Sequence, residues 1–128
     1  MNLPENLKYT KSHEWVLIEG ENATMGITEF AVEQLGDITL VECPQVGENV
    51  NANDTMGTIE SVKAVSDLYC PVSGEINAVN DALEDEPEKV NADCYGAGWI
   101  AKITLGDDAS DEDLMDATAY EEYLDSLD

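Results

Sequence analysis

The sequence predicts a mainly β fold, a barrel or sandwich of short antiparallel strands with a short internal helix and a C-terminal amphipathic helix. Two observations support this prediction. The middle of the chain consists of short runs rich in β-branched residues, separated by Gly, Asn, Asp and Pro at close intervals. Two other segments combine a capping residue with helical apolar spacing. With 128 residues, the chain fits one domain, which we expect to span residues 1–128.

Residues typical of turns separate the predicted strands. Gly20, Glu21 and Asn22 separate the first two strands, which predicts a hairpin. The third strand stops at Pro44, which cannot donate a hydrogen bond to a sheet. The spacing of the strands is typical of an all-β sandwich or barrel. The predicted strands are Trp15–Glu19, Ala23–Ile27, Ile38–Cys43, Thr55–Val62, Val65–Tyr69, Glu75–Val79 and Trp99–Leu105.

Capping residues and apolar spacing predict the two helices. Thr28 can cap a helix over Glu29–Leu35, and Gly36 can supply its left-handed end. Ser110 can cap a helix over 110–127, and the segment from Asp107 to Asp128 contains ten acidic residues. We interpret these charges as the solvated face of the helix, and a tail that docks on a partner is the alternative. The apolar stripe of this helix is Leu114, Ala117, Tyr120, Tyr123, Leu124 and Leu127.

The charge of the chain restricts its partners. It contains 29 acidic residues, five lysines and no arginine, and its formal net charge is −24. Such a surface repels nucleic-acid phosphates and anionic lipid, so we expect neither nucleic acid nor membrane as a partner and favour proteins with basic docking faces. No apolar run approaches the roughly 18 residues of a membrane span. Met1–Lys11 lacks the pattern of a signal or transit peptide, which predicts a cytoplasmic, prokaryotic protein.

The residues that most often carry metal or nucleophilic chemistry are few. Cys43, Cys70 and Cys94 are widely spaced and form no C-x-x-C pair, and His13 is the one histidine. This pattern predicts no zinc site and no disulfide framework, so we expect buried or half-buried thiols. We interpret His13 as a structural hydrogen-bonding residue rather than a base. Trp15 and Trp99 are predicted to lie in the core. A His13–cysteine pair acting as base and nucleophile is the alternative that an enzyme would need.

One lysine stands apart in the acidic chain. Between Ser12 and Glu88 there are 17 acidic residues, and Lys63 is the one lysine. Its neighbours Val62 and Ala64 are small or apolar, and strand-like runs extend in both directions, which predicts that Lys63 lies at the tip of a hairpin. A weak internal echo flanks it, because 46–50 (Val-Gly-Glu-Asn-Val) resembles 72–76 (Val-Ser-Gly-Glu-Ile). An ordinary surface lysine is the competing interpretation.

The sequence around this lysine is similar to that of a known family. Glu60-Ser61-Val62-Lys63-Ala64 resembles the lipoylation motif of glycine cleavage H proteins, and differs from the Asp-Lys-Ala and Met-Lys-Met sites of other carriers. The resemblance extends from about Leu7 to Leu105, plus the C-terminal helix. Cys43, Cys70 and Cys94 depart from it, and Cys94 lies where the family commonly has proline before the tyrosine seen here as Tyr95. Further matching blocks are 9–15, 26–28, 35–37, 71–75, 79–80 and 98–99.

This resemblance implies a lipoyl-domain-like hybrid barrel and sandwich, and a carrier rather than an enzyme. Lipoate would be amide-linked to Lys63 by lipoate-attaching enzymes. The lipoyl arm would take the aminomethyl group of glycine from a pyridoxal-phosphate glycine decarboxylase (P protein) to a folate-dependent aminomethyltransferase (T protein). Dihydrolipoamide dehydrogenase (L protein) would reoxidise the dithiol. A monomer suits such a shuttle.

The resemblance also implies a cleft for the loaded arm. Ser12, Glu14 and Asp67 match the family's positions there, and their hydroxyl or carboxylate groups would hold the ammonium. Solvated loop residues are the alternative interpretation of all three. At the level of function, the alternatives are an H-like protein that relays lipoyl groups to other lipoate-dependent enzymes, and a plain acidic interaction module. Whether a free thiol exchanges with the lipoyl disulfide is left open.

Overall fold

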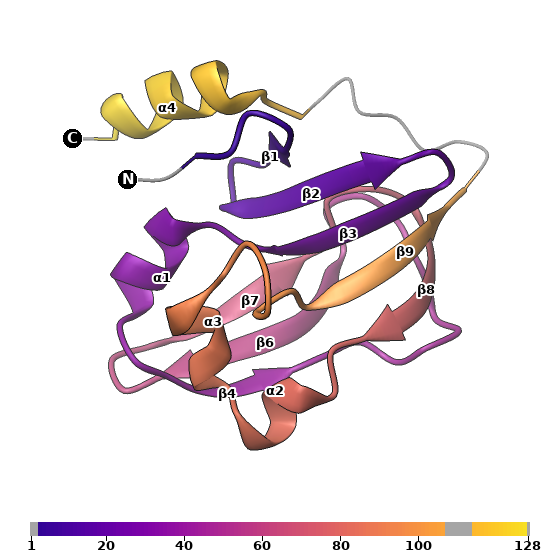
Figure 1. The fold of residues 1–128 in the computed structure, drawn as a ribbon, viewed down its shortest axis with the longest axis horizontal. Helices are drawn as coiled ribbons and strands as arrows, with labels where there is room; N and C mark the ends of the chain where they lie inside the picture. Colours follow the sequence, from indigo (N-terminus) through magenta and orange to yellow (C-terminus); the bar gives the residue numbers. More distant parts are fainter. Residues whose placement is uncertain (1–2, 107–113, 128) are drawn as a thin grey trace.

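Two antiparallel sheets make up most of the chain in the computed structural model, which describes residues 3–106 and 114–127. The strands within these ranges are β1 Lys8–Tyr9, β2 Glu14–Glu19, β3 Asn22–Ile27, β4 Ile38–Glu42, β5 Asn49–Val50, β6 Thr55–Ser61, β7 Val65–Tyr69, β8 Gly74–Val79 and β9 Ala101–Leu105. The larger sheet has the order β1-β2-β3-β9-β8-β5, and the smaller sheet has the order β4-β6-β7 (Figure 1). The predicted mainly β fold is confirmed.

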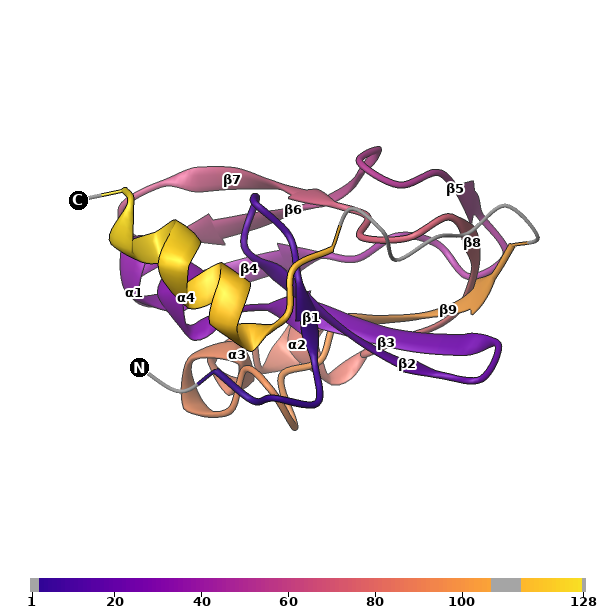
Figure 2. The ribbon, with the colours of Figure 1, turned by 90° about the horizontal axis from the view of Figure 1, so that it is seen from above.

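The core lies between the two sheets, which form separate layers in Figure 2. Met25 and Ile103 of the larger sheet are fully buried, and Ile59 and Leu68 of the smaller sheet are 2% and 1% exposed. All four belong to one apolar cluster. Alternation along the strands places these side chains inward and leaves polar neighbours outward. Each predicted strand is present, with ends that differ from the prediction by one or two residues.

The internal helix is confirmed as α1, Glu29–Leu35. The Thr28 hydroxyl accepts a hydrogen bond from the Ala31 backbone N–H at 3.3 Å, which is the expected N-cap. At the other end Gly36 has φ 75°, and its N–H donates to the Val32 carbonyl at 2.9 Å. A residue with a side chain rarely adopts this backbone conformation, so the glycine permits the chain to turn into β4.

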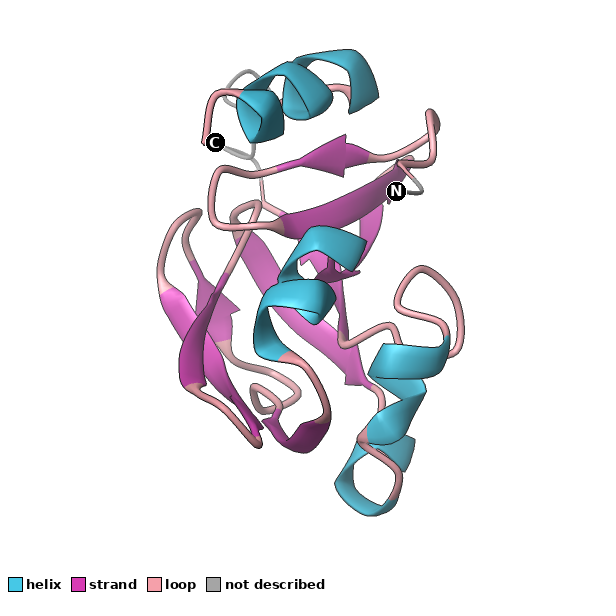
Figure 3. Ribbon diagram, turned by 90° about the vertical axis from the view of Figure 1, so that its left-hand side faces the viewer, coloured by secondary structure: helices cyan, strands magenta, loops and turns pink. Residues whose placement is uncertain are grey.

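Two short helices were not predicted. These are α2, Ala82–Asp85, and α3, Glu88–Ala92, and both contact β4 (Figure 1). Leu83 and Val90 are fully buried and join the core cluster from these helices. Burial of these two side chains stabilises helices that are too short to show a clear apolar period. Figure 3 shows that α1 lies between this pair and the C-terminal helix at one end of the molecule.

Of the two tryptophans predicted to lie in the core, Trp15 is 2% exposed, which confirms its prediction. The prediction for Trp99 is wrong. Trp99 is half-buried and precedes β9, which begins at Ala101. Its ring packs at the edge of a second apolar cluster, and the Lys102 ammonium lies 5.1 Å from the ring centre. A tryptophan that packs beneath a lysine at the surface satisfies its apolar body without full burial.

The C-terminal helix begins later than predicted. The described helix α4 covers Ala117–Asp125, and Asp116 caps it by accepting from the Ala119 N–H at 2.8 Å. Met115 is extended, because its N–H and carbonyl both bond to the backbone of Tyr9 at 2.8 and 2.7 Å. The predicted helix over 110–127 is therefore wrong at 114–116, and its predicted cap Ser110 lies outside the described residues.

The two segments of the internal echo lie side by side. Strands β5 and β8 pair antiparallel, with Asn49 opposite Glu75 and Val50 opposite Gly74. Adjacent to this pairing, the Ile76 carbonyl accepts from the Gly47 N–H at 2.7 Å. The pairing supports the interpretation of the echo as a repeated strand unit on either side of Lys63. No helix in the described part of the chain is long and apolar enough to cross a membrane.

Candidate functional site

Lys63 lies in the tight turn between β6 and β7, as predicted, and its side chain is exposed. The Ser61 N–H donates to the Ala64 carbonyl at 2.8 Å and closes the turn. The Ser61 hydroxyl oxygen accepts from the backbone N–H groups of Lys63 at 3.2 Å and Ala64 at 3.0 Å. Ser61 therefore organises the backbone on both sides of the lysine, which is a common role of serine in turns.

Two exposed apolar side chains lie beside Lys63, and the lysine forms no ion pair with any described residue. Val62 and Val65 on either side of it are 67% and 66% exposed, although both are large aliphatic residues. In the part of the chain that the structure describes, the one salt bridge joins Lys89 and Glu86 at 3.1 Å. Lys63 thus carries its amine on an exposed turn with no carboxylate attached to it.

A buried carboxylate lies elsewhere on the chain, at the start of β2. Glu14 is 2% exposed. Its Oε1 accepts hydrogen bonds from the hydroxyls of Thr10 at 2.6 Å and Ser12 at 2.5 Å, and its Oε2 accepts from the Tyr69 N–H at 3.4 Å. Burial raises the pKa of Glu14 from 4.5 to about 7, although these hydrogen bonds oppose the rise. The side chain therefore changes charge near neutral pH.

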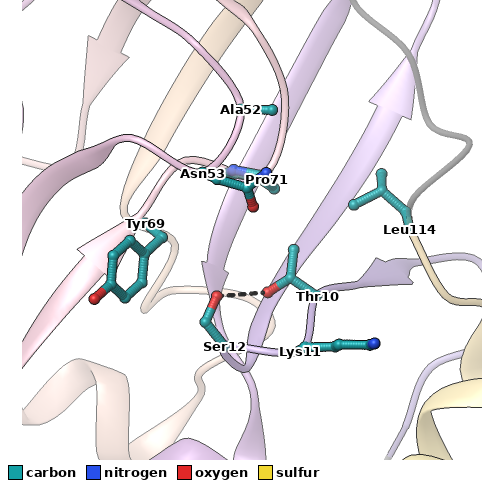
Figure 4. A pocket seen from close by; sticks show the side chains of 8 residues that line it. All are labelled: Thr10, Lys11, Ser12, Ala52, Asn53, Tyr69, Pro71 and Leu114. Atoms are coloured by element: carbon teal, nitrogen blue, oxygen red, sulfur yellow. Dashed lines mark hydrogen bonds between the residues drawn. The ribbon is translucent and has the colours of Figure 1, made fainter.

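A cavity of about 620 Å³ opens beside this carboxylate. Thr10 and Ser12 share a 3.2 Å hydrogen bond on one side of it, with Asn53 and Pro71 facing them, and Lys11 points away (Figure 4). Because both hydroxyls also bond to Glu14, the carboxylate lies in the wall beneath them. The lining residues are Thr10, Lys11, Ser12, Ala52, Asn53, Tyr69, Pro71 and Leu114.

Strand β7 connects the lysine turn with this cavity. Val65 begins the strand next to the turn, and Tyr69 at its other end lines the cavity. Four residue steps of about 3.3 Å separate them, so the distance along the strand is about 13 Å. A long flexible arm that starts at Lys63 can reach the cavity along this strand.

Of the three predicted cleft residues, the structure brings Ser12 and Glu14 together. Ser12 lines the cavity and bonds to Glu14. Asp67 is exposed, pairs in register with Thr58, and does not line the cavity. Because side chains two apart on a strand share a face, Asp67 lies on the same face of β7 as Tyr69, nearer to the lysine. The sequence missed Thr10, Asn53, Tyr69 and Leu114, which reach the cavity from separate segments and share no local pattern.

His13 takes the structural role predicted for it. Its Nδ1 lies 2.8 Å from the Tyr120 hydroxyl, and its ring packs 4.5 Å from the Phe30 ring. The same Tyr120 hydroxyl lies 2.8 Å from the Thr28 hydroxyl. Burial lowers the pKa of His13, which keeps the ring neutral at neutral pH. The Tyr120 hydroxyl therefore joins the His13 loop to both α1 and α4.

The three thiols are free, as predicted. Cys70 and Cys94 are buried and Cys43 is half-buried. Burial raises the pKa of Cys43 and of Cys70 to about 11, and that of Cys94 to about 12. Thiolate is the reactive form, so these thiols are poor nucleophiles at neutral pH. Among residues 3–106 and 114–127, no group of three or more His, Cys, Asp or Glu side chains is placed to hold a metal.

Comparison with known proteins identifies the family. The family model described as glycine cleavage H-protein matches residues 7–127. The chain belongs to the glycine cleavage H-protein family. The H protein of Bacteroides thetaiotaomicron is 55% identical over 120 residues, covering 94% of this chain and 95% of the relative. An H protein of Escherichia coli is 55% identical over 124 residues, covering 96% of each chain.

A solved structure of the glycine cleavage H-protein family has the same fold. The crystal structure of a glycine cleavage system H protein from Mycobacterium marinum matches with a TM-score of 0.83 at 39% identity, and the match covers 98% of both chains. The predicted lipoyl-domain-like fold is confirmed. Members of this family are lipoyl carriers in glycine cleavage and hold lipoate covalently on a lysine.

Proposed function

We propose that the chain acts as one domain over residues 1–128, bears lipoate on Lys63, and carries the aminomethyl group of glycine. The group would pass from the pyridoxal-phosphate decarboxylase to the folate-dependent aminomethyltransferase, and dihydrolipoamide dehydrogenase would reoxidise the dithiol. The observation that carries the proposal is the place of Lys63, on an exposed turn that strand β7, about 13 Å long, connects to the cavity. When bound, the lipoyl group supplies the disulfide that accepts the aminomethyl group.

The other lysines fit this role less well. Lys89 is ion-paired with Glu86 at 3.1 Å, and the Lys102 ammonium covers the Trp99 ring. Lys8 belongs to β1. Lys11 lines the cavity, so a long arm attached to it would start too close to the cavity to fold into it and also reach a partner enzyme. Lys63 lies on an exposed turn between β6 and β7, away from the cavity, whereas Lys11, on the exposed turn between β1 and β2, lines it.

The cavity suits an aminomethyl-ammonium. Glu14 is held by two hydroxyls in its wall, and a cation placed beside it would favour the charged carboxylate and lower its pKa from about 7. Ser12 and Thr10 can accept further hydrogen bonds from the ammonium through their oxygens. Asp67 would meet the arm before it enters the cavity. Such enclosure limits the access of water to a group that water removes.

The remaining features are consistent with a carrier. We infer that the chain performs no catalysis of its own and acts as a monomer in the cytoplasm of a prokaryote, since its curated relatives are bacterial. Its net charge of −24 favours partners with basic docking faces. Its partners would be the decarboxylase, the aminomethyltransferase, the dehydrogenase and the lipoate-attaching enzymes.

The decarboxylase exchanges the glycine carboxyl group with bicarbonate only in the presence of a lipoylated carrier. This exchange tests the proposal. Lipoylated wild type should support the exchange, whereas Lys63→Arg prepared in parallel should not. Lys89→Arg is the matched control, because it keeps a cation beside Glu86. Exchange at the wild-type rate with Lys63→Arg would refute the assignment.

A further inference from the structure

The aliphatic stem of Lys63 lies across a glycine at the end of α1. If Gly36 carried a Cβ, that atom would lie 2.9 Å from the Lys63 Cε, 3.6 Å from its Nζ and 3.9 Å from its Cδ. A carbon at 2.9 Å is well inside van der Waals contact, so a side chain at position 36 would require the flexible end of Lys63 to move from this place. The absent side chain of Gly36 therefore forms a seat for Lys63.

The backbone that follows this glycine is also fixed to the lysine turn. The Asp37 carbonyl accepts a hydrogen bond from the Val62 N–H at 3.0 Å. Ile38, the next residue, begins β4 and pairs in register with Ser61. The segment Gly36–Ile38 therefore contacts the lysine turn through its backbone as well as through the stem of Lys63.

One side chain from another helix holds this segment. Asn91, on α3, accepts from the Ile38 N–H at 3.0 Å through Oδ1 and donates from Nδ2 to the Gly36 carbonyl at 2.8 Å. A single amide thus bridges the residues on either side of Asp37. The Ile38 N–H and the Gly36 carbonyl both belong to the connection between α1 and β4. Among the described side chains, Asn91 is the one that bonds to both ends of this connection.

We propose that Asn91 and Gly36 are positioning residues for the attachment of lipoate, with Asn91 fixing the seat and the seat directing the stem of Lys63. This inference rests on the proposed function of Lys63. In the attachment step, the Lys63 Nζ attacks the carbonyl carbon of lipoyl adenylate, which the attaching enzyme makes from lipoate and ATP. The C–N bond forms, the bond from the carbonyl carbon to the phosphate oxygen breaks, AMP leaves with its electron pair, and the amine releases a proton.

The rate of such a step depends on the orientation of the attacking amine. A displacement of about 1 Å in a reacting group can lower a rate by up to about 100-fold. Loss of the Asn91 bridge leaves the exposed surfaces of the turn unchanged, so the enzyme should still recognise them. We therefore expect kcat for attachment to depend on Asn91, and KM for the protein substrate to be independent of it.

Asn91→Asp is the sharpest variant. It keeps an acceptor for the Ile38 N–H but replaces the donor to the Gly36 carbonyl with a second oxygen. With lipoate–protein ligase, lipoate and ATP, we expect kcat to fall about tenfold, with KM within about twofold of wild type. Asn77→Asp is the control for charge, because Asn77 is exposed and bonds to Thr104 away from the lysine. It should be lipoylated at the wild-type rate.

A nuclear Overhauser effect between the Lys63 Hε and Gly36 Hα protons reports the seat directly in the unmodified protein. It should be present in wild type and Asn77→Asp, and weakened in Asn91→Asp. Its absence from wild type would overturn the inference, as would a raised KM with unchanged kcat or a wild-type kcat in Asn91→Asp. Peptide mapping of the products separates the two proposals. Label on Lys63 with equal rates refutes only the seat, whereas label on another lysine refutes the proposed function itself.

Discussion

The hydroxyl of Tyr120 lies 2.8 Å from the Nδ1 of His13 and connects the C-terminal helix to the loop beside the cavity. Tyr120 is fully buried, stacks on Tyr9 with ring centres 4.7 Å apart, and also meets the Thr28 hydroxyl at 2.8 Å. Thr28 in turn caps α1. One phenol therefore joins α4, α1 and the loop that carries Ser12, which makes the C-terminal helix part of the support of the cavity.

Removal of this hydroxyl should destabilise the fold. Tyr120→Phe keeps the stacked ring but leaves the His13 nitrogen without its described partner, and we expect a loss of about 1–2 kcal/mol in the free energy of unfolding. Urea unfolding measures it. Tyr123→Phe is the control, because its hydroxyl makes one exposed bond, to the Lys11 carbonyl at 3.3 Å. Equal stability of the two variants would show that the Tyr120 hydroxyl has no such role.

Loss of the buried carboxylate should shorten the lifetime of the loaded carrier. Glu14→Ala removes the anion that we place beside the ammonium, so the aminomethyl group should be lost to water faster, by about tenfold for one charge-assisted hydrogen bond. Asp67→Ala, outside the cavity, should have a smaller effect. Release of ammonia and formaldehyde from the isolated loaded protein measures both. If neither variant changes the rate, neither residue holds the ammonium.

The stability of the protein should depend on pH through Glu14. Burial raises its pKa from 4.5 to about 7, so the folded state binds more protons than the unfolded state between these values. Its contribution is complete below about pH 4.5 and is lost as the pH rises through about 7. Glu14→Gln does not titrate and should gain stability relative to wild type between pH 5 and pH 8.

Urea unfolding of both proteins at several pH values measures this difference. Glu33→Gln, at an exposed position on α1, is the control, and its curve should run parallel to that of wild type. The lowered pKa of His13 acts in the opposite direction, because the unfolded state then takes up the proton first as the pH falls. It is present in all three proteins and cancels in the comparison. A Glu14→Gln curve parallel to that of wild type would contradict the raised pKa.

The thiols should not exchange with a lipoyl disulfide at neutral pH. The pKa values of Cys70 and Cys94 are raised to about 11 and about 12, and both residues are buried. Reaction with an aromatic disulfide reagent at pH 7.5 should be at least about 100-fold slower in the folded protein than in urea. Half-buried Cys43 should react first. A mixed disulfide between a cysteine and the lipoyl group of the same chain, found by peptide mapping without reduction, would disprove this.

The sequence predicts those elements whose signals are local. Thr28 and Gly36 mark both ends of α1, because a cap and a left-handed exit act within one turn of helix. The start of α4 was misplaced because Leu114 continues its apolar spacing, although the backbone of Met115 pairs with Tyr9 instead. That pairing joins residues more than a hundred positions apart. No local pattern reports it.

The site shows the same division. Lys63 is conspicuous in the sequence because its charge and its motif are both local. The buried carboxylate of Glu14 accepts a hydrogen bond at its Oε2 from the backbone N–H of Tyr69, 55 positions away. A glutamate beside a strand gives no sign of such a partner. Asn91 was missed for the same reason, since its two bonds reach the chain more than fifty positions earlier.

The central claim is that Lys63 is the sole site of lipoate attachment, and intact-mass measurement tests it most directly. Wild type and Lys63→Arg are incubated with lipoate–protein ligase, lipoate and ATP, with Lys89→Arg as control. Arginine keeps the cation but is not acylated. We expect a gain of one lipoyl mass in wild type and Lys89→Arg, and none in a folded Lys63→Arg. A lipoyl mass on Lys63→Arg, or none on wild type, would contradict it.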